Sequence, residues 1–169
     1  MRICDRHGYR SHDAGNCGLH VHLSRAYFGE TELAQKDNLS NLVYFYDRYY
    51  DELFKASRRR WGQCDHYCHK SGFAHAREIR RHLNIEHGHI WDRYCAVNLS
   101  NYPTVEIRLG RGTLRYESFD AWIDMTVVIA QNICDIGWTD LNNPKNVLEG
   151  IKPETVEYLK SRNAFQGVL

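Results

Sequence analysis

The sequence lacks the features that mark membrane, secreted or disordered proteins. No apolar run approaches the roughly 20 residues of a membrane span, and Met1-Arg2-Ile3-Cys4-Asp5 has no apolar signal-peptide core. Proline occurs only three times against eleven tyrosines, which is typical of an ordered globular chain. The six cysteines have no regular spacing, so we expect reduced thiols in a cytoplasmic protein and no disulfide framework.

An excess of charge of one sign is also missing. Twenty-two basic residues face twenty-one acidic ones, so the composition predicts no general attraction to nucleic acid or to an acidic membrane. The chain contains no internal repeat and no low-complexity segment, and its 169 residues suffice for one domain over 1–169 with a buried core. Ten histidines, by contrast, form a high count that directs attention to metal ligands.

Two segments alternate between apolar and polar residues, as half-buried strands do. Between Cys17 and Ser24 the aliphatic residues alternate with His20 and His22, so both imidazoles project from the same face. Neutral imidazole is a good ligand for a divalent cation, and a strand fixes its direction.

The second such segment, Thr104–Leu109, places Glu106 and Arg108 on one face and its aliphatic residues on the other. We expect Gly110-Arg111-Gly112 to end this strand in a turn that carries another guanidinium. A carboxylate with two arginines suits a metal ion and a phosphate. A solvated strand face whose charges pair with each other is the alternative.

Apolar periodicity predicts several helices and one more strand. The strand, Tyr94–Leu99, is expected to pair antiparallel with Thr104–Leu109 through the turn Asn101-Tyr102-Pro103. His87 and His89 are interpreted as surface residues. The predicted helices run from an N-cap at Asn38 or Ser40 to about Arg58, from Phe73 to Asn84, from Glu117 or Ser118 to Gly137, and from short starts at Pro144 and Pro153.

Two further clusters allow more than one interpretation. Arg58-Arg59-Arg60 suits a helix C-terminus, and a phosphate-binding arginine or a nucleic-acid patch are the other readings. Four ligand-type side chains lie within six residues, namely Cys64, His66, Cys68 and His69. Structural zinc commonly uses two spaced pairs, and no second cysteine pair follows, so zinc is a minor alternative.

The two strand segments together carry a family resemblance. Gly18-Leu19-His20-Val21-His22-Leu23-Ser24 resembles the Gly-Met-His-x-His-x-Ser strand of the glutamine synthetase fold. Thr104-Val105-Glu106-Ile107-Arg108, followed by Gly112-Thr113-Leu114, resembles the later Glu-x-Arg strand of that fold.

Within that fold, Arg93-Tyr94, Asn98 and the helix from Ser118 are most similar to the amidoligase family of bacterial and phage carboxylate-amine ligases. The resemblance covers roughly residues 15 to 135. It implies an α+β fold, partly like the glutamine synthetase catalytic domain, in which an antiparallel sheet carries the site and helices pack on its other face.

The resemblance also implies ATP-dependent formation of an amide bond on an amino acid or peptide through an acyl phosphate, with Mg²⁺ or Mn²⁺. By position, His20 and Glu106 match family metal ligands. Arg108 matches an arginine that steadies the transferred phosphate, so Arg108 and Glu106 are the expected catalytic residues. His22 matches a nucleotide-contacting histidine, and Arg93 and Arg111 are further cofactor-binding candidates.

The sequence departs from the family at its start. Relatives begin with a strand bearing Glu-x-Glu, whereas Met1 lies nineteen residues before His20, and Glu30 and Glu32 follow the histidine strand. Three readings stay open: a C-terminal fragment of a longer domain, a site completed by another chain in a homo-oligomer, or lost catalysis. The alternative to a ligase is therefore a non-catalytic, ligase-like binding module without a complete metal site.

Overall fold

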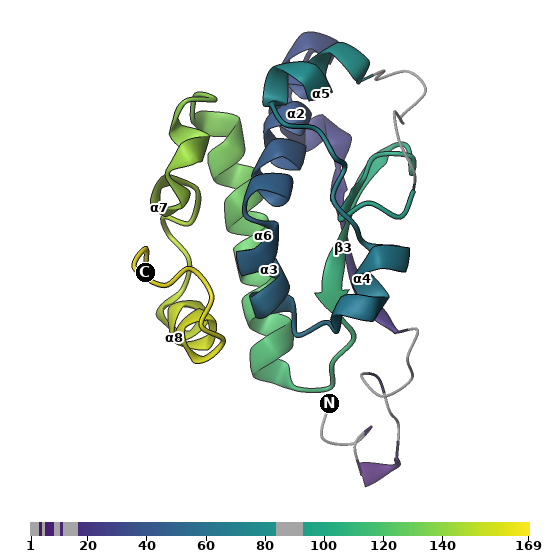
Figure 1. The fold of residues 1–169 in the computed structure, drawn as a ribbon, viewed down its shortest axis with the longest axis vertical. Helices are drawn as coiled ribbons and strands as arrows, with labels where there is room; N and C mark the ends of the chain where they lie inside the picture. The colour runs from purple at the N-terminus through teal and green to yellow at the C-terminus, as the bar shows by residue number, and fades with distance from the viewer. Residues whose placement is uncertain (1–3, 5, 9–10, 12–16, 84–92) are drawn as a thin grey trace.

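The computed structural model describes residues 4, 6–8, 11, 17–83 and 93–169. Over these residues the fold is α+β, with one three-stranded antiparallel sheet and seven α-helices (Figure 1). His87 and His89 lie outside the described residues. None of the described helices combines the length and the apolar composition that a membrane span requires.

The sheet contains β1 (Gly18–Ser24), β2 (Val97–Asn98) and β3 (Thr104–Arg111), in the order β1-β3-β2. The central strand β3 runs antiparallel to both neighbours, which confirms the strands expected from period-two alternation. The strand predicted over Tyr94–Leu99 is shorter than expected, since β2 contains only Val97 and Asn98.

The end of β3 differs from the prediction. Gly110 and Arg111 belong to the strand and not to a turn, because they pair with Leu19 and Gly18 of β1. A Cβ on Gly110 would lie 2.5 Å from the indole nitrogen of Trp122, so the close approach of the neighbouring helix explains this glycine.

A β-bulge interrupts the pairing of β1 and β3. Leu19 pairs with Gly110 and Val21 with Ile107, so two residues of β3, Arg108 and Leu109, lie opposite the single residue His20. Bulges increase the local twist and re-aim side chains. The irregularity therefore falls on the residues that the sequence marks as functional.

The helices fill one side of the sheet. Their bounds are α2 (Glu32–Arg48), α3 (Tyr50–Ser57), α4 (Trp61–Tyr67), α5 (Ala76–His82), α6 (Tyr116–Asp135), α7 (Pro144–Val147) and α8 (Pro153–Ser161), with short 3₁₀ segments at Arg25–Phe28 and Asp140–Asn142. As predicted, proline begins both α7 and α8, where its missing N–H costs nothing.

The first long helix starts earlier than predicted. Thr31 is its N-cap and accepts a hydrogen bond from the N–H of Ala34. Asn38 and Ser40 lie inside α2, and their side chains donate to backbone carbonyls instead. Tyr49 then separates α2 from α3, so the aromatic stripe spans two consecutive helices.

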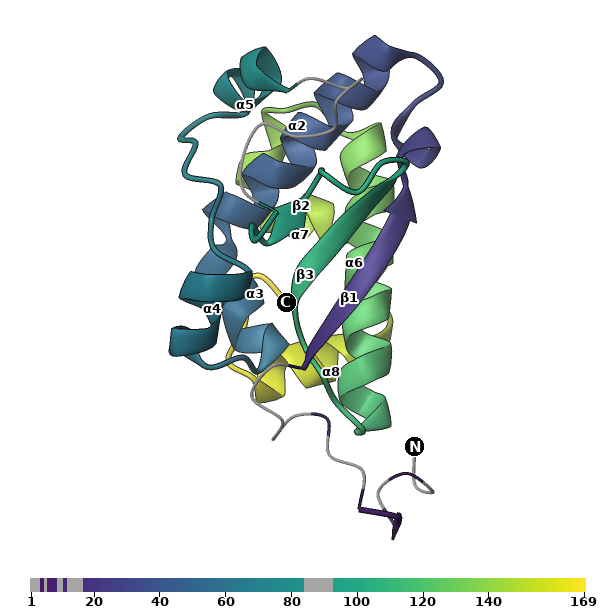
Figure 2. The ribbon, with the colours of Figure 1, turned by 90° about the vertical axis from the view of Figure 1, so that its right-hand side faces the viewer.

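The apolar side of the sheet faces the helices. The other side, here called the open face, is exposed along β1, whereas Glu106 and Arg108 of β3 are buried there. Val105, Ile107 and Leu109 are fully buried in the core. Figure 2 shows α2, α6 and α7 behind the sheet, with β1 and β3 in front of them. The face that carries His20, His22 and Glu106 is therefore left without a helical layer over β1.

Candidate functional site

The open face of the sheet is organised around one buried carboxylate, that of Glu106 in β3. Its side chain is only 4% exposed. Four side chains contact its two oxygens: Arg108 Nη1 at 2.9 Å and His20 Nδ1 at 2.7 Å from Oε1, and Asn98 Nδ2 at 2.7 Å and Asn101 Nδ2 at 2.8 Å from Oε2.

These contacts determine the charge of the carboxylate. Burial alone raises the pKa of Glu106, but the hydrogen bonds from Asn98 and Arg108, together with the charges of Arg108 and His20, outweigh it. The pKa of Glu106 therefore lies below its usual value. At neutral pH the site holds an ionised carboxylate that is surrounded by donors.

His20 is oriented by this carboxylate. Burial and, after it, the positive charge of Arg108 lower the pKa of His20, so its imidazole is neutral at pH 7. An ionised carboxylate only accepts hydrogen bonds, so Nδ1 carries the proton that His20 shares with Glu106. The lone pair of His20 then resides on Nε2.

Gly18 makes room for this arrangement. A Cβ at this position would stand 2.5 Å from Nη2 of Arg59 and 2.7 Å from Nε2 of His20, which is too close for any other residue without displacement. The close packing of Arg59 and His20 therefore explains why glycine occupies position 18.

Arg108 is fixed on three sides. It is 8% exposed, contacts Glu106 through Nη1, and donates from Nε to the carbonyl of Tyr67 at 3.2 Å. Its guanidinium also lies 5.7 Å from the ring centroid of Tyr94. Because its partners come from β3, the end of α4 and the segment before β2, the position of this cation depends on the tertiary fold.

Arg59 is a site residue that the sequence did not single out from its basic run. It is buried and binds the backbone at the bulge, from Nε to the carbonyls of Leu109 at 3.0 Å and Gly110 at 3.2 Å, and from Nη2 to the carbonyl of Arg108 at 2.9 Å. It thus supplies donors to the backbone of β3 just beyond Glu106. Nothing in the run Arg58-Arg59-Arg60 distinguishes the residue that does this.

The other three predicted residues have different surroundings. His22 is opposite Glu106, with Nε2 3.7 Å from its Oε1, so it belongs to the same cluster. Arg93 is exposed and lies 5.2 Å from the ring centroid of Tyr94, the ring that Arg108 also contacts. Arg111 lines a separate pocket at the end of β3.

The described residues do not make a complete site for Mg²⁺ or Mn²⁺. No group of three or more His, Cys, Asp or Glu side chains within the described ranges is arranged to hold a metal ion. Magnesium requires near-octahedral coordination mainly by oxygen, and here the single carboxylate already receives an arginine. The metal therefore stays a prediction from the resemblance.

The four candidate zinc ligands do not share one environment. Cys64 and Cys68 are buried, whereas His66 is exposed. His69 Nδ1 lies 3.7 Å from Sγ of Cys95, which is not one of the four. In the part of the chain that the structure describes, these residues form no four-ligand group.

Comparison of the chain with protein-family models, curated proteins and solved structures finds no match in any of the three. The geometry of the site and the two strand motifs are therefore the observations that bear on the function of the protein.

Proposed function

We propose that this chain is a domain of an ATP-dependent carboxylate-amine ligase, which forms an amide bond on an amino acid or peptide through an acyl phosphate. The observation that supports the proposal is the convergence of His20, His22 and Arg108 on Glu106, on the open face of the sheet. Two motifs about eighty residues apart in sequence supply these side chains, as a shared site requires.

In this proposal Arg108 binds the phosphate group that is transferred from ATP to the substrate carboxylate. Its guanidinium is held by Glu106, Tyr67 and Tyr94, so few rotamers have to be restricted when a ligand binds. Arginine presents a planar fork of donors that matches phosphate and carboxylate oxygens. It would stabilise the negative charge on the phosphate group as this group is transferred.

His20 would act as the base for the amine. As the amine nitrogen bonds to the carbonyl carbon of the acyl phosphate, the carbon–oxygen bond to phosphate breaks and phosphate leaves with the electron pair. The proton that the amine loses passes to Nε2 of His20, whose neutral state is favoured by its lowered pKa. Glu106 holds the imidazole in the required tautomer.

A bound divalent metal ion would neutralise part of the negative charge of the nucleotide phosphates. The described residues offer it one carboxylate and two imidazoles, which is less than a magnesium site needs. No step above is therefore assigned to the metal.

The test is phosphate release from ATP with Mg²⁺ or Mn²⁺ and pools of amino acids or peptides. Glu106→Gln and His20→Ala should each abolish ATP-dependent amide formation, because the first removes the ionised carboxylate and the second removes the base. His75→Ala changes an exposed histidine at the start of α5 and should retain full activity, so it is the matched control.

Circular dichroism checks that each variant is folded. Absence of phosphate release from the folded wild-type chain would contradict the ligase.

A non-catalytic, ligase-like binding module is the second candidate. The observation in its favour is that both oxygens of Glu106 already accept hydrogen bonds from side chains of this chain. A purely structural hydrogen-bond network would have the same arrangement. Calorimetry with ATP and Mn²⁺ separates the two functions. Binding without turnover supports the module, turnover supports the enzyme, and neither result would exclude both.

A further inference from the structure

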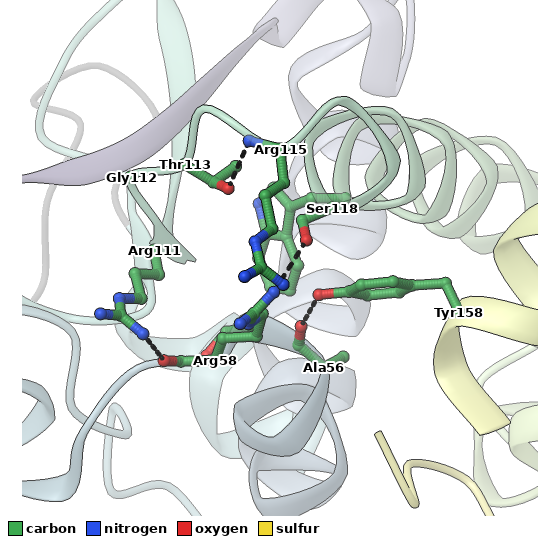
Figure 3. Close-up of a pocket in the computed structure, with 10 residues that line it drawn as sticks. Ala56, Arg58, Arg111, Gly112, Thr113, Arg115, Ser118 and Tyr158 are labelled. Atoms are coloured by element: carbon green, nitrogen blue, oxygen red, sulfur yellow. Dashed lines mark hydrogen bonds between the residues drawn. The ribbon is translucent and has the colours of Figure 1, made fainter. Parts of the chain in front are cut away.

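A second polar site lies at the C-terminal end of β3, where the chain leads into α6. It is a small pocket of about 40 Å³ between the end of α3, the connection from β3 to α6, the first turn of α6 and α8 (Figure 3). We refer to it as the three-arginine pocket, after Arg58, Arg111 and Arg115.

The three arginines come from different segments of the chain. Arg58 follows α3, Arg111 ends β3 and Arg115 precedes α6. Nη1 of Arg58 donates to Oγ of Ser118 at 3.3 Å, and Nη1 of Arg111 donates to the carbonyl of Arg58 at 3.2 Å (Figure 3). Among the described residues that line the pocket, none is Asp or Glu. Arg58 and Arg115 bring two like charges to this small space, where they repel each other, and an anion between them would offset that cost.

The start of α6 and the indole N–H of Trp122 are further hydrogen-bond donors at this pocket. The start of α6, a helix of 20 residues, has Arg115 as its N-cap, and the Arg115 side chain makes no capping hydrogen bond to the first N–H groups. Trp122 lines the pocket and is 2% exposed, and its indole N–H has no hydrogen-bond partner among the described residues. A buried donor without an acceptor is costly, so an anion that reached this N–H group would remove that cost.

The backbone of Arg58 supports the same conclusion. Its φ of 62° lies in the left-handed region, where a helix C-terminus usually has glycine. Arginine at such a position costs about 1 kcal/mol relative to glycine. Strained residues of this kind occur at ligand-binding sites, and here the strained residue contributes a guanidinium to the pocket.

We propose that the three-arginine pocket binds one oxyanion group of a small molecule, either a phosphate or a carboxylate. The volume suits a single such group, and the donors come from guanidinium groups and the start of a helix. The inference does not depend on the ligase proposal, since neither Glu106 nor His20 lines this pocket.

Titration with inorganic phosphate and, separately, with acetate tests the proposal by ¹H–¹⁵N NMR of the tryptophan indole groups. We expect a saturable shift of the Trp122 signal, while the exposed Trp61 and Trp138 do not shift. Tighter binding of phosphate identifies a phosphoryl ligand, and tighter binding of acetate identifies a carboxylate. A Trp122 signal that does not respond to either anion would overturn the proposal.

Two variants separate the pocket from general charge. Arg58→Gly removes one guanidinium at a position whose backbone suits glycine, so the fold should persist while phosphate binds at least about tenfold more weakly. Arg60→Ala removes the same charge from an exposed neighbour outside the pocket and should change binding less than about twofold. Equal weakening in both variants would show that the anion responds only to net charge.

A third variant separates this site from the open face of the sheet. His20→Ala should leave the response of Trp122 to phosphate unchanged, because His20 does not line the three-arginine pocket. Loss of the response in His20→Ala would assign the anion to the Glu106 cluster and refute a second site.

Discussion

The Glu106 cluster and the three-arginine pocket use the same cation in opposite electrostatic settings. Arg108 contacts a carboxylate at 2.9 Å, and that carboxylate has a donor on each oxygen. Arg58, Arg111 and Arg115 line a space to which the described residues contribute no carboxylate. The comparison shows that the internal counter-charge, and not the number of arginines, decides whether a polar site is already assembled or needs an anion to balance it.

The backbone is regular and supported at the Glu106 cluster, and it is strained at the three-arginine pocket. The cluster lies on paired strands, and its one irregularity, the bulge opposite His20, is held by Arg59. The pocket lies where three elements end, and one of its arginines has a left-handed backbone. We therefore expect the cluster to contribute to stability and the pocket to reduce it, and four predictions test this difference.

The largest effect is expected at Glu106. Glu106→Gln removes the charge that Arg108 and His20 face and leaves these donors partly unmatched in a buried setting. The free energy of unfolding should fall by about 3 kcal/mol. Urea denaturation measures it, with the exposed Glu157→Gln on α8 as control. A loss below about 1 kcal/mol would contradict an assembled network.

The stability that Glu106 supplies should also depend on pH. Its pKa is lower in the folded chain than the usual value of 4.5, so below that value the unfolded chain binds more protons than the folded one. The contribution is fully present above pH 4.5 and is lost as the pH falls through the folded pKa. The difference in unfolding free energy between wild type and Glu106→Gln should therefore shrink below about pH 4.5. A difference that stays constant down to pH 3 would contradict the lowered pKa.

A smaller effect of opposite sign is expected at Arg58. Arg58→Gly relieves the left-handed backbone and the repulsion between Arg58 and Arg115, so it should raise the free energy of unfolding by about 1 kcal/mol in phosphate-free buffer. Thermal unfolding with and without phosphate measures this gain. If the variant is less stable than wild type without any anion, Arg58 is structural and the contrast between the two sites fails.

The smallest effect is expected at His22. Its side chain is 46% exposed and 3.7 Å from the carboxylate, beyond a hydrogen bond. His22→Ala should change the free energy of unfolding by less than about 0.5 kcal/mol. If His22 contacts the nucleotide, as the family resemblance implies, the same variant should weaken ATP binding in calorimetry. A large loss of stability would place His22 inside the structural network.

Local alternation was enough to predict both strands of the site. The imidazoles of β1 and the Glu-x-Arg pair of β3 follow from a period of two, and the structure confirms these two strands. Local sequence patterns gave the wrong end of a strand where that end depends on pairing with residues distant in the sequence. Gly110 and Gly112 suggested a turn that contains Arg111, but pairing of Gly110 and Arg111 with β1 extends the strand.

Helix ends show the same division. Proline at the starts of α7 and α8 was predicted correctly, because its constraint lies within the residue itself. Glu117 or Ser118 was predicted as the start of the helix, yet α6 begins at Tyr116, and the Ser118 hydroxyl accepts from Arg58, sixty residues earlier. A side chain with a tertiary partner no longer serves as a local signal.

The sequence by itself determined which residues share a face: His20 with His22, and Glu106 with Arg108, since side-chain direction follows from the strand period. Tertiary structure alone decided that the two faces meet at one carboxylate, that Arg59 holds the bulge, and that Arg111 joins Arg58 and Arg115 elsewhere. The physical reason is that periodicity fixes direction within an element. Distance, burial and counter-charge depend on which elements pack together.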